Sequence, residues 1–420
     1  MASISIKQIA FASFVGTAIE FYDFYIYAMA AALVIGPVFF PAGDATAQSL
    51  NAFLTFGIAF VARPLGALMF GHFGDKFGRK TTLAASLLVM GVCTLLIGLL
   101  PGYETLGWLA PVALCVLRFG QGIGLGGEWG GAALLATEYA PPGKRGWFGM
   151  FPQLGPSIGF LLATLSYLAL TLFLSESQFN AWGWRVPFIA SALLVGVGLY
   201  VRFRLAETPA FVTARQRHEL HAVPLKALFH QYLGAVGLGA LAMVVCYNLF
   251  YTATVFCLSY GTRELGIPRA EFLQLLCIAV LFMTLATPIS AALSDSFGRR
   301  PVLIFSNFLA VLAGFALAPL MQGGVVAIAV FLGLALFLMG ASFAPMGAFL
   351  PEQFPVALRY TGAGVAYQLG GILGASLAPY LSQLLVSEGG LAWVGMYMSV
   401  MALVSLGAVW AMRETKSITV

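Results

Sequence analysis

Five ionisable residues lie inside long apolar segments of this 420-residue chain, all in its first half: Glu20, Asp23, Arg63, Arg118 and Glu128. A charged side chain inside a membrane is expensive, and it usually marks a path for substrate or protons. Carboxylates can take up and release protons, and arginines can hold an anion. The combination therefore indicates chemistry that couples proton movement to an anionic solute.

Glu20 and Asp23 are three residues apart, so they share one helix face, which Tyr27 extends. At about 1.5 Å of rise per residue they lie roughly 15 and 20 Å from the inner end of their helix, near mid-membrane. A carboxyl group buried beside a like charge is easier to protonate than one in water. We therefore predict proton-coupling roles for Asp23 and Glu20. Glu128 is either a further proton site or a hydrogen-bonding partner of another helix.

The two arginines are candidates for holding a substrate carboxylate, because arginine stays charged when buried. Arg118 lies in the outer half of its segment, and Gln121 follows one turn later. Arg63 lies deeper, where it either attracts a carboxylate or braces a gate. We include Tyr27, Arg63, Arg118 and Gln121 in a predicted substrate site.

The second half of the chain offers polar but neutral groups at helical spacing. Tyr247, Asn248 and Tyr251 fall in one apolar segment, and Tyr367 and Gln368 fall in another. Such groups either orient a solute through hydrogen bonds or join neighbouring helices. We include all five in the predicted substrate site.

Composition sets the class of protein that carries these residues. The chain is 60% hydrophobic and 9% charged, whereas soluble domains carry about 25% charged residues. Apolar runs of about 20 residues can span the hydrocarbon core as helices. The runs are too continuous for barrel strands, which alternate at every residue. We predict an all-α membrane protein.

The apolar runs and the turn residues between them predict twelve spans. The spans fall near residues 9–36, 50–71, 81–100, 107–138, 147–174, 183–203, 232–260, 270–292, 301–321, 324–350, 361–386 and 391–412. The long polar stretch between spans six and seven predicts a linker. The predicted domains are a six-helix bundle over residues 1–204, a cytoplasmic linker over 205–230 and a second six-helix bundle over 231–420.

The basic residues predict the orientation, because Lys and Arg concentrate in cytoplasmic loops. With both termini inside, sixteen of the 21 basic residues lie on the cytoplasmic side: Lys7, Lys76, Arg79, Lys80, Lys144, Arg145, Arg202, Arg204, Arg215, Arg217, Lys226, Arg299, Arg300, Arg359, Arg413 and Lys416. We therefore expect a multi-pass protein of a bacterial inner membrane, with the lipid bilayer as its environment.

Two pairs of segments repeat at equivalent places in the two halves. The loop from Gly71 to Lys80 matches that from Ala291 to Arg300, and Glu138-x-x-Pro-x-x-x-Arg145 matches Glu352-x-x-Pro-x-x-x-Arg359. The repetition indicates a duplicated six-helix unit. Charged clusters beside tight turns suit a latch that closes the cytoplasmic face. The predicted gate residues are Gly71, Asp75, Arg79, Lys80, Asp295, Arg299, Glu138, Arg145, Glu352 and Arg359.

These motifs resemble those of the major facilitator superfamily. The Gly71–Lys80 loop, Arg118–Gly122 and Gly155–Gly159 are similar to its signatures, although the second loop has Ala291 and Ser294 in place of glycines. Other segments resemble the metabolite:proton symporter family, which includes carriers of shikimate, α-ketoglutarate, citrate and proline/betaine. They are Ala18–Phe24, Ala62–Gly66, Gly126–Gly131 and Glu207–Phe211.

The resemblance implies two pseudo-symmetric six-helix bundles and proton-coupled import of a solute by alternating access. In the superfamily's sugar:proton carriers, an acidic residue of span one pairs with the arginine of span four. The resemblance carries this role to Asp23 and Arg118; a static ion pair is the alternative. An organic acid suits the arginines, whereas a zwitterionic osmolyte such as betaine or proline suits the mixture of charges and aromatics. A non-transporting solute sensor is a third alternative.

Several other classes are excluded at this stage. The sequence contains no Gly-x-x-x-x-Gly-Lys-Ser/Thr nucleotide-binding motif and no metal-ligand spacing of histidine, cysteine or acidic residues. The five cysteines all lie in apolar runs and are expected to act as small packing residues. We expect no enzymatic activity, no cofactor, no metal and no nucleic acid. The expected partners of a monomeric chain are a small-molecule solute and the proton.

Overall fold

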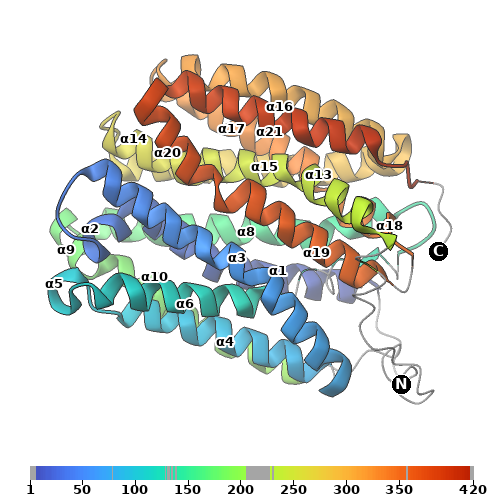
Figure 1. The fold of residues 1–420 in the computed structure, drawn as a ribbon, viewed down its shortest axis with the longest axis horizontal. Helices are drawn as coiled ribbons and strands as arrows, with labels where there is room; N and C mark the ends of the chain where they lie inside the picture. The colour runs from blue at the N-terminus through green and yellow to red at the C-terminus, as the bar shows by residue number, and fades with distance from the viewer. Residues whose placement is uncertain are drawn as a thin grey trace.

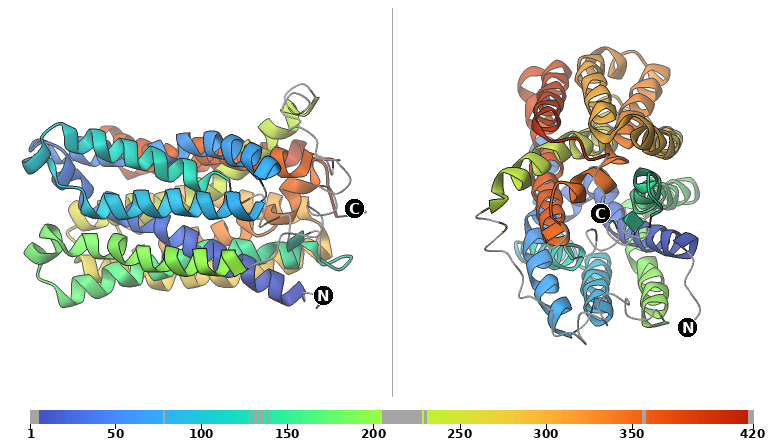
Figure 2. Two further views of the ribbon diagram at one scale, coloured as in Figure 1. Left: turned by 90° about the horizontal axis from the view of Figure 1, so that it is seen from below. Right: turned by 90° about the vertical axis from the view of Figure 1, so that its right-hand side faces the viewer.

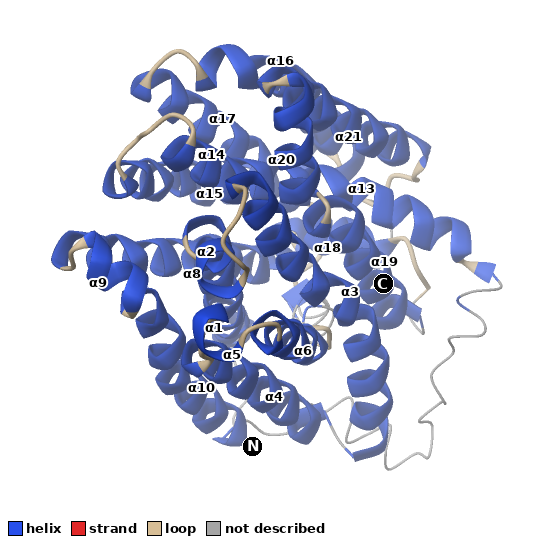
Figure 3. Cartoon of the chain, turned by 60° about the vertical axis from the view of Figure 1, so that its left-hand side comes forward, coloured by secondary structure: helices blue, strands red, loops and turns tan. Residues whose placement is uncertain are grey.

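The computed structural model describes residues 6–77, 79–127, 140–204, 231–355 and 358–416, together with residues 129, 133, 136, 137 and 228. Every regular element within these residues is helical (Figure 3). The predicted all-α class is therefore confirmed. Helices are the expected solution in a bilayer, because each one satisfies its own backbone hydrogen bonds.

The helices of the first half are long and connected by short turns. They are α1 (Ile6–Leu33), α2 (Ile35–Phe39), α3 (Ala45–Phe77), α4 (Arg79–Leu99), α5 (Tyr103–Leu106), α6 (Leu109–Leu125), α8 (Arg145–Phe173), α9 (Glu176–Ala181) and α10 (Val186–Arg204), with a 3₁₀ turn at Gly183–Arg185. Residues 129, 133, 136 and 137 are also helical.

The second half repeats the pattern with three interrupted helices. Its elements are α13 (Leu233–Tyr251), α14 (Cys257–Arg263), α15 (Arg269–Phe297), α16 (Arg299–Met321), α17 (Val325–Phe343), α18 (Met346–Glu352), α19 (Arg359–Gly371), α20 (Ala378–Gly389) and α21 (Leu391–Ala411). Helical segments thus cover all twelve predicted spans within the described residues. Nine of the helices there are long and apolar enough to cross a membrane, and α4 and α6 are shorter apolar helices.

The helices form two groups that lie side by side with their long axes aligned. Figure 1 shows α1, α3, α4, α6 and α10 in one group, and α16, α17 and α21 in the other. Seen along the bundle, the two groups remain separate (Figure 2). α8 packs against both α1 and α15, so it joins the groups. The end of the bundle at which α1 begins and α21 ends is called here the termini face, and the opposite end the far face.

Two helices of the second half contain π-helical segments that the sequence did not predict. One lies at Thr252–Phe256 between α13 and α14, and the other at Ile372–Ser376 between α19 and α20. The first contacts α1 and the second contacts α3. Widened turns of this kind are frequent at functional sites. Each one here redirects a helix of the second half where that helix meets the first half.

Glycines allow α3 and α6 to touch backbone to backbone. A Cβ atom at Gly122 would lie 2.2 Å from the carbonyl oxygen of Ala59, and one at Gly126 would lie 2.0 Å from that of Arg63. Small residues at a helix interface permit such close approach in membranes. The contact fixes the relative position of the two helices that carry Arg63 and Arg118.

We predict that Gly122→Ala lowers the melting midpoint of the purified protein in detergent. The added methyl group must push α3 and α6 apart, and overpacking of this kind costs about 1–3 kcal/mol. Gly196→Ala is the matched control, because no atom lies within 4 Å of a Cβ at Gly196 in α10. Equal melting midpoints for the two variants would contradict the role assigned to this contact.

Candidate functional site

Arg118 is fully buried at the centre of the first half. Its guanidinium donates to the side-chain oxygen of Gln121, and its Nη2 donates to the carbonyl oxygen of Phe56 at 3.1 Å. Its Cζ atom lies 3.7 Å from the ring centroid of Tyr27. The Tyr27 hydroxyl in turn lies 2.7 Å from the Thr55 hydroxyl. Arg118, Gln121 and Tyr27 thus come together, as the sequence predicted.

Arg63 is also buried, with 2% of its surface exposed. Its Cζ atom lies 4.3 Å from the ring centroid of Phe24 and 4.1 Å from that of Phe60. Its Nε and Nη2 atoms are buried and donate no hydrogen bond to any residue that the structure describes. Two cation–π contacts hold this guanidinium, and two of its donors have no hydrogen-bond partner among the residues that the structure describes.

The two arginines meet at one aromatic ring. Arg118 Cζ lies 5.2 Å from the centroid of Phe24, the same ring that Arg63 covers. Neither guanidinium lies within ion-pair distance of a carboxylate in the described part of the chain. Glu128 lies outside the described residues. Two like charges are therefore buried close together without a described counterion.

Four tyrosines from both halves lie within electrostatic reach of the Arg63 charge: Tyr25, Tyr247, Tyr251 and Tyr367. Tyr25 belongs to α1, whereas the other three belong to α13 and α19. Together with Phe24, Phe56 and Phe60, these tyrosines are called here the central cluster. The sequence pattern identified the three tyrosines of the second half, but it missed Tyr25 and the phenylalanines, because apolar aromatics are common in every span.

Asp23 is completely buried, but it does not contact Arg118. Neither carboxylate oxygen accepts a hydrogen bond from a described residue. The neighbouring hydroxyl belongs to Ser191 of α10, and it donates to the carbonyl oxygen of Phe188 at 2.9 Å. The predicted Asp23–Arg118 ion pair is therefore not formed in this structure, because Asp23 faces α10 while Arg118 faces α3.

Gln121 connects Asp23 with Arg118 instead of a direct ion pair. Its amide nitrogen donates to the backbone carbonyl oxygen of Asp23 at 3.3 Å and to the Thr94 hydroxyl at 2.9 Å, while its oxygen accepts from Arg118. Gln121 is therefore a direct hydrogen-bonded link between the backbone of α1 at Asp23 and the side chain of Arg118. Glu20 lies on the same helix, is buried, and has an interaction partner.

The predicted polar residues of the second half separate into two sets. Tyr247, Tyr251 and Tyr367 belong to the central cluster, and Gln368 donates to the carbonyl oxygen of Gly126 at 3.1 Å, across the interface between the halves. Asn248 instead lies beside Tyr397 of α21. Asn248 therefore contacts a helix of its own half, which is the packing alternative considered for it.

A stacked aromatic pair lies next to the central cluster and was missed by sequence reasoning. The rings of Trp129 and Tyr367 are 3.9 Å apart and inclined by 9°. The Trp129 indole donates to Gln153 at 3.1 Å, and Gln153 donates to the carbonyl oxygen of Phe343 at 2.9 Å. This chain of contacts runs from one half of the protein to the other, so it helps to close the space between them.

Contacts also join the halves at the far face. Arg269 of α15 lies 4.0 Å from the carboxylate of Glu176 in α9 and 4.0 Å from the ring centroid of Phe179. Arg263 of α14 donates to the hydroxyl of Ser49 in α3. The far face is therefore bridged in this structure.

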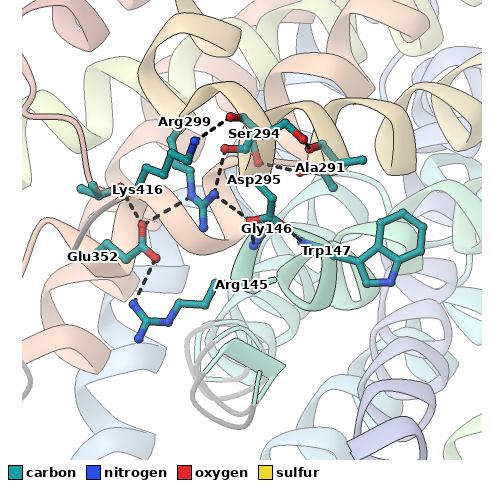
Figure 4. Close-up of polar contacts among 12 residues, drawn as sticks. Arg145, Gly146, Trp147, Ala291, Ser294, Asp295, Arg299, Glu352 and Lys416 are labelled. Atoms are coloured by element: carbon teal, nitrogen blue, oxygen red, sulfur yellow. Dashed lines mark hydrogen bonds and ion pairs between the residues drawn. The ribbon is translucent and has the colours of Figure 1, made fainter. Parts of the chain in front are cut away.

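The termini face is bridged by the predicted gate residue Asp295. Its carboxylate accepts hydrogen bonds from the backbone N–H groups of Gly146 and Trp147, both at 2.8 Å (Figure 4). These groups belong to the first turn of α8, where a helix dipole favours negative charge. Arg299 lies 2.7 Å from the same carboxylate. A side chain at Gly146 would collide with Ser294 and Asp295.

Glu352 forms the second part of this contact. It lies 3.8 Å from Arg145 of the first half and 3.7 Å from Arg299 of its own half (Figure 4). Thr415 donates to it at 2.6 Å, and the charge of Arg359 also acts on it. The two repeated Glu/Arg motifs therefore interact crosswise, Arg145 of one with Glu352 of the other. The termini-face latch is the name used here for the following residues: Arg145, Glu352, Asp295, Gly146, Trp147 and Arg299.

The first copy of the predicted gate cannot be placed in the same detail. The following residues, or their side chains, lie outside the described part of the chain: Gly71, Asp75, Arg79, Lys80 and Glu138. The same is true of the linker predicted at 205–230, apart from residue 228. The boundary between the predicted domains therefore stays a prediction.

Comparison with known families identifies the class of protein. The family described as "Sugar (and other) transporter" matches residues 9–228, and the Major Facilitator Superfamily matches residues 240–419. The chain belongs to the major facilitator superfamily. Its fold is accordingly the twelve-span fold of that superfamily, and it is a transporter rather than an enzyme.

The relatives are carriers of metabolites. An inner membrane metabolite transport protein of Escherichia coli K12, YhjE, is 50% identical over 98% of this chain and 94% of its own length. The shikimate transporter of the same strain is 35% identical over 98% of this chain and 95% of its own length. The proline/betaine transporter of that strain is 32% identical over 97% of this chain and 83% of its own length. The chain therefore belongs among the metabolite transporters of the superfamily.

The solved structures agree on the fold. The xylose transporter XylE of Escherichia coli, in a partially occluded inward-open conformation, superposes with a TM-score of 0.77 at 18% identity, and the match covers 100% of both chains. A crystal structure of a D-xylose–proton symporter gives a TM-score of 0.75 over 98% of this chain and 99% of that one, at 17% identity.

We predict that Asp295→Asn loosens the termini face. The variant loses the charge that Gly146, Trp147 and Arg299 contact, and a hydrogen bond to a charged group contributes about 1.5–3 kcal/mol. Amide hydrogen exchange at the start of α8 should accelerate about tenfold or more. Glu388→Gln, at an exposed carboxylate near the opposite end of the bundle, is the control. Unchanged protection at Gly146 and Trp147 would refute the latch.

Proposed function

We propose that this chain is a proton-coupled symporter that imports a small organic acid by alternating access. The observation that carries the proposal is the burial of Arg63 and Arg118 at one aromatic ring, without an ion pair to any described carboxylate. A buried charge without a partner is strongly unfavourable. The carboxylate of a substrate would supply the missing counterion.

The unpaired polar atoms near the arginines support a substrate with further polar groups. The Tyr247 hydroxyl and the side-chain oxygen of Gln368 are buried and, like Nε and Nη2 of Arg63, form no hydrogen bond to a described residue. Buried polar groups are normally paired. A compact acid with additional oxygen or hydroxyl groups would satisfy both unpaired donors of Arg63, the Tyr247 hydroxyl and the Gln368 side-chain oxygen at once.

Asp23 is the group that we assign to the proton, and Glu20 and Glu128 are secondary candidates. A carboxylate buried without hydrogen bonds is stable only when it is protonated. The environment of Asp23 in this closed form therefore suits the proton-loaded state. Loss of the proton would draw Asp23 toward a cation, and the Gln121 bridge connects it with Arg118. Pairing of Asp23 with Arg118 would then belong to another step of the cycle.

The contacts at both ends support a closed intermediate of alternating access. Opening toward one side would break the Arg269–Glu176 and Arg263–Ser49 contacts, and opening toward the other would break the termini-face latch. The charge bias of the loops supports a cytoplasmic position for the termini face in a bacterium. Release of solute there would follow separation of Asp295 from α8.

A zwitterionic osmolyte is the second candidate, because the central cluster is rich in aromatic rings. Phe56, Phe60 and Tyr251 lie 5.2–5.5 Å apart between ring centroids, and such rings can hold a quaternary ammonium group. In this protein, however, the rings of Phe24 and Phe60 are already covered by Arg63. The arrangement therefore favours an anion over a cationic headgroup.

We predict that Arg63→Gln and Arg118→Gln each weaken carboxylate binding about 10- to 100-fold, the loss expected for a charge-assisted hydrogen bond. Fluorescence titration of the purified protein with a panel of organic acids and with glycine betaine provides the measurement. Lys144→Gln, at an exposed cation, is the control. Unchanged binding of acids by both arginine variants, or binding of betaine alone, would reject the organic-acid proposal.

We predict that Asp23→Asn abolishes accumulation driven by a pH gradient but retains exchange of solute across proteoliposome membranes. An amide cannot take up the proton, but it preserves the size of the side chain. Glu264→Gln, at an exposed carboxylate, should accumulate solute normally. Gradient-driven accumulation by the Asp23 variant equal to that of the unaltered protein would refute the assignment.

A further inference from the structure

An apolar groove lies on the outer surface of the second half, between α16 and α21. It has a volume of about 520 Å³ and is lined by Arg300, Pro301, Ile304, Phe305 and Phe308 of α16 and by Trp410 of α21. Phe305 and Trp410 are 65% and 64% exposed. Large aromatics exposed on a helix that spans a membrane face lipid. The floor of the groove is therefore suited to hydrocarbon.

One end of the groove is cationic. Arg300 is the second residue of α16, and Trp410 is the last residue but one of α21, so both lie at the termini face. The Arg300 guanidinium donates to the carbonyl oxygen of Trp410 and lies 5.7 Å from the Trp410 ring centroid. Its Nε atom is buried and has no hydrogen-bond partner among the described residues. The guanidinium is thus held in place with a donor unused.

The neighbouring charges leave this site positive. Glu414 is the nearest acidic group, but its carboxylate accepts from the backbone N–H groups of Arg299 and Arg300 at 3.0 and 2.9 Å. Burial alone would raise the pKa of Glu414, but the backbone N–H groups of Lys416, Arg300, Arg299 and Thr415 hold it below its usual value. Glu414 is therefore ionised and engaged by the start of α16, and it forms no ion pair with the Arg300 side chain.

Lys416 adds a second positive charge at the same end. Its ammonium group donates to the carbonyl oxygen of Ser296 at 2.6 Å and is exposed. Arginine suits phosphate because its planar fork can donate two parallel hydrogen bonds. Basic groups between transmembrane helices favour anionic lipid headgroups, and tryptophan favours the boundary between lipid and water.

We propose that this groove binds one anionic phospholipid. Its phosphate lies on Arg300, with Lys416 nearby, and an acyl chain lies over Ile304, Phe305 and Phe308. The combination of an apolar floor, an interfacial tryptophan and an oriented arginine matches each part of such a lipid. Because Glu414 and Thr415 connect this corner with Arg299 and Glu352 of the termini-face latch, the bound lipid stabilises the closed termini face.

The test uses the full chain purified in detergent, titrated with phosphatidylglycerol and, in parallel, with phosphatidylcholine. Native mass spectrometry counts the bound lipids. The unaltered protein should retain one phosphatidylglycerol in preference to phosphatidylcholine. Arg300→Gln should weaken that binding about tenfold, because a charge-assisted contact to phosphate is lost, whereas Arg300→Lys should keep most of it. Lys144→Gln, at an exposed cation of the same face, should have no effect.

A second pair of variants tests the apolar floor. Phe305→Ala should weaken phosphatidylglycerol binding, whereas Phe315→Ala, at an equally exposed position further along α16, should not. Equal binding by the Arg300→Gln and unaltered proteins would overturn the proposal. Displacement of the lipid by glycerol phosphate would show that a free phosphate suffices, and a dimer lost in Arg300→Gln would show that a second copy occupies the groove; either result would also overturn it.

Discussion

The burial of two guanidinium groups at one aromatic ring is the constraint on which the rest of this structure depends. Arg63 and Arg118 share Phe24, and neither is paired with a described carboxylate. The cost of burying charge is limited by cation–π contacts, by backbone carbonyls and by Gln121. These contacts hold the side chains in place without neutralising them, so the centre of the protein remains positive, which is the basis for proposing an anionic substrate.

The surrounding packing fixes the positions of Arg63 and Arg118 relative to each other. The glycines at the end of α6 bring its backbone into contact with that of α3, and the π-helical segments that follow α13 and α19 contact α1 and α3. The same helices carry the tyrosines that face Arg63. The first half thus supplies the buried charges, and the second half supplies neutral hydroxyl and amide groups. A carrier built in this way can change the access to its site while the charges stay on one rigid half.

The two ends of the bundle are closed by contacts of different kinds. At the far face, Arg269 contacts Glu176 and Phe179 of the first half, and Arg263 contacts Ser49. At the termini face, Asp295 caps α8 while Glu352 lies between arginines of both halves. The C-terminal residues Glu414 and Thr415 hold the start of α16 and Glu352 in place. The termini-face contact is therefore the more extensively supported of the two, and it adjoins the groove at Arg300.

The sequence by itself determined the class, the twelve-span fold and the burial of Glu20, Asp23, Arg63 and Arg118, but it did not predict that Arg299, Glu352 and Arg359 are buried as well. Apolar length decides where a helix crosses a membrane, so ten of the twelve predicted spans match continuous or π-interrupted helices closely, the tenth span is broken by a turn between α17 and α18, and the fourth is described only in part. Burial could be predicted because Asp23, Arg63 and Arg118 lie well inside those runs. The repeated loops also grouped Asp295, Arg145 and Glu352 as gate residues; the structure brings the three together at one end, and their role as a gate stays a prediction.

Only the tertiary structure decided which of these residues meet. A helical sequence specifies the spacing of side chains on one helix, but the rotation of that helix against its neighbours depends on packing. Asp23 therefore faces α10 rather than Arg118, Asn248 faces Tyr397 rather than the central cluster, and Arg145 pairs with Glu352 of the other repeat. The direction in which each buried charge points is set by contacts between residues far apart in the chain, and no local pattern records it.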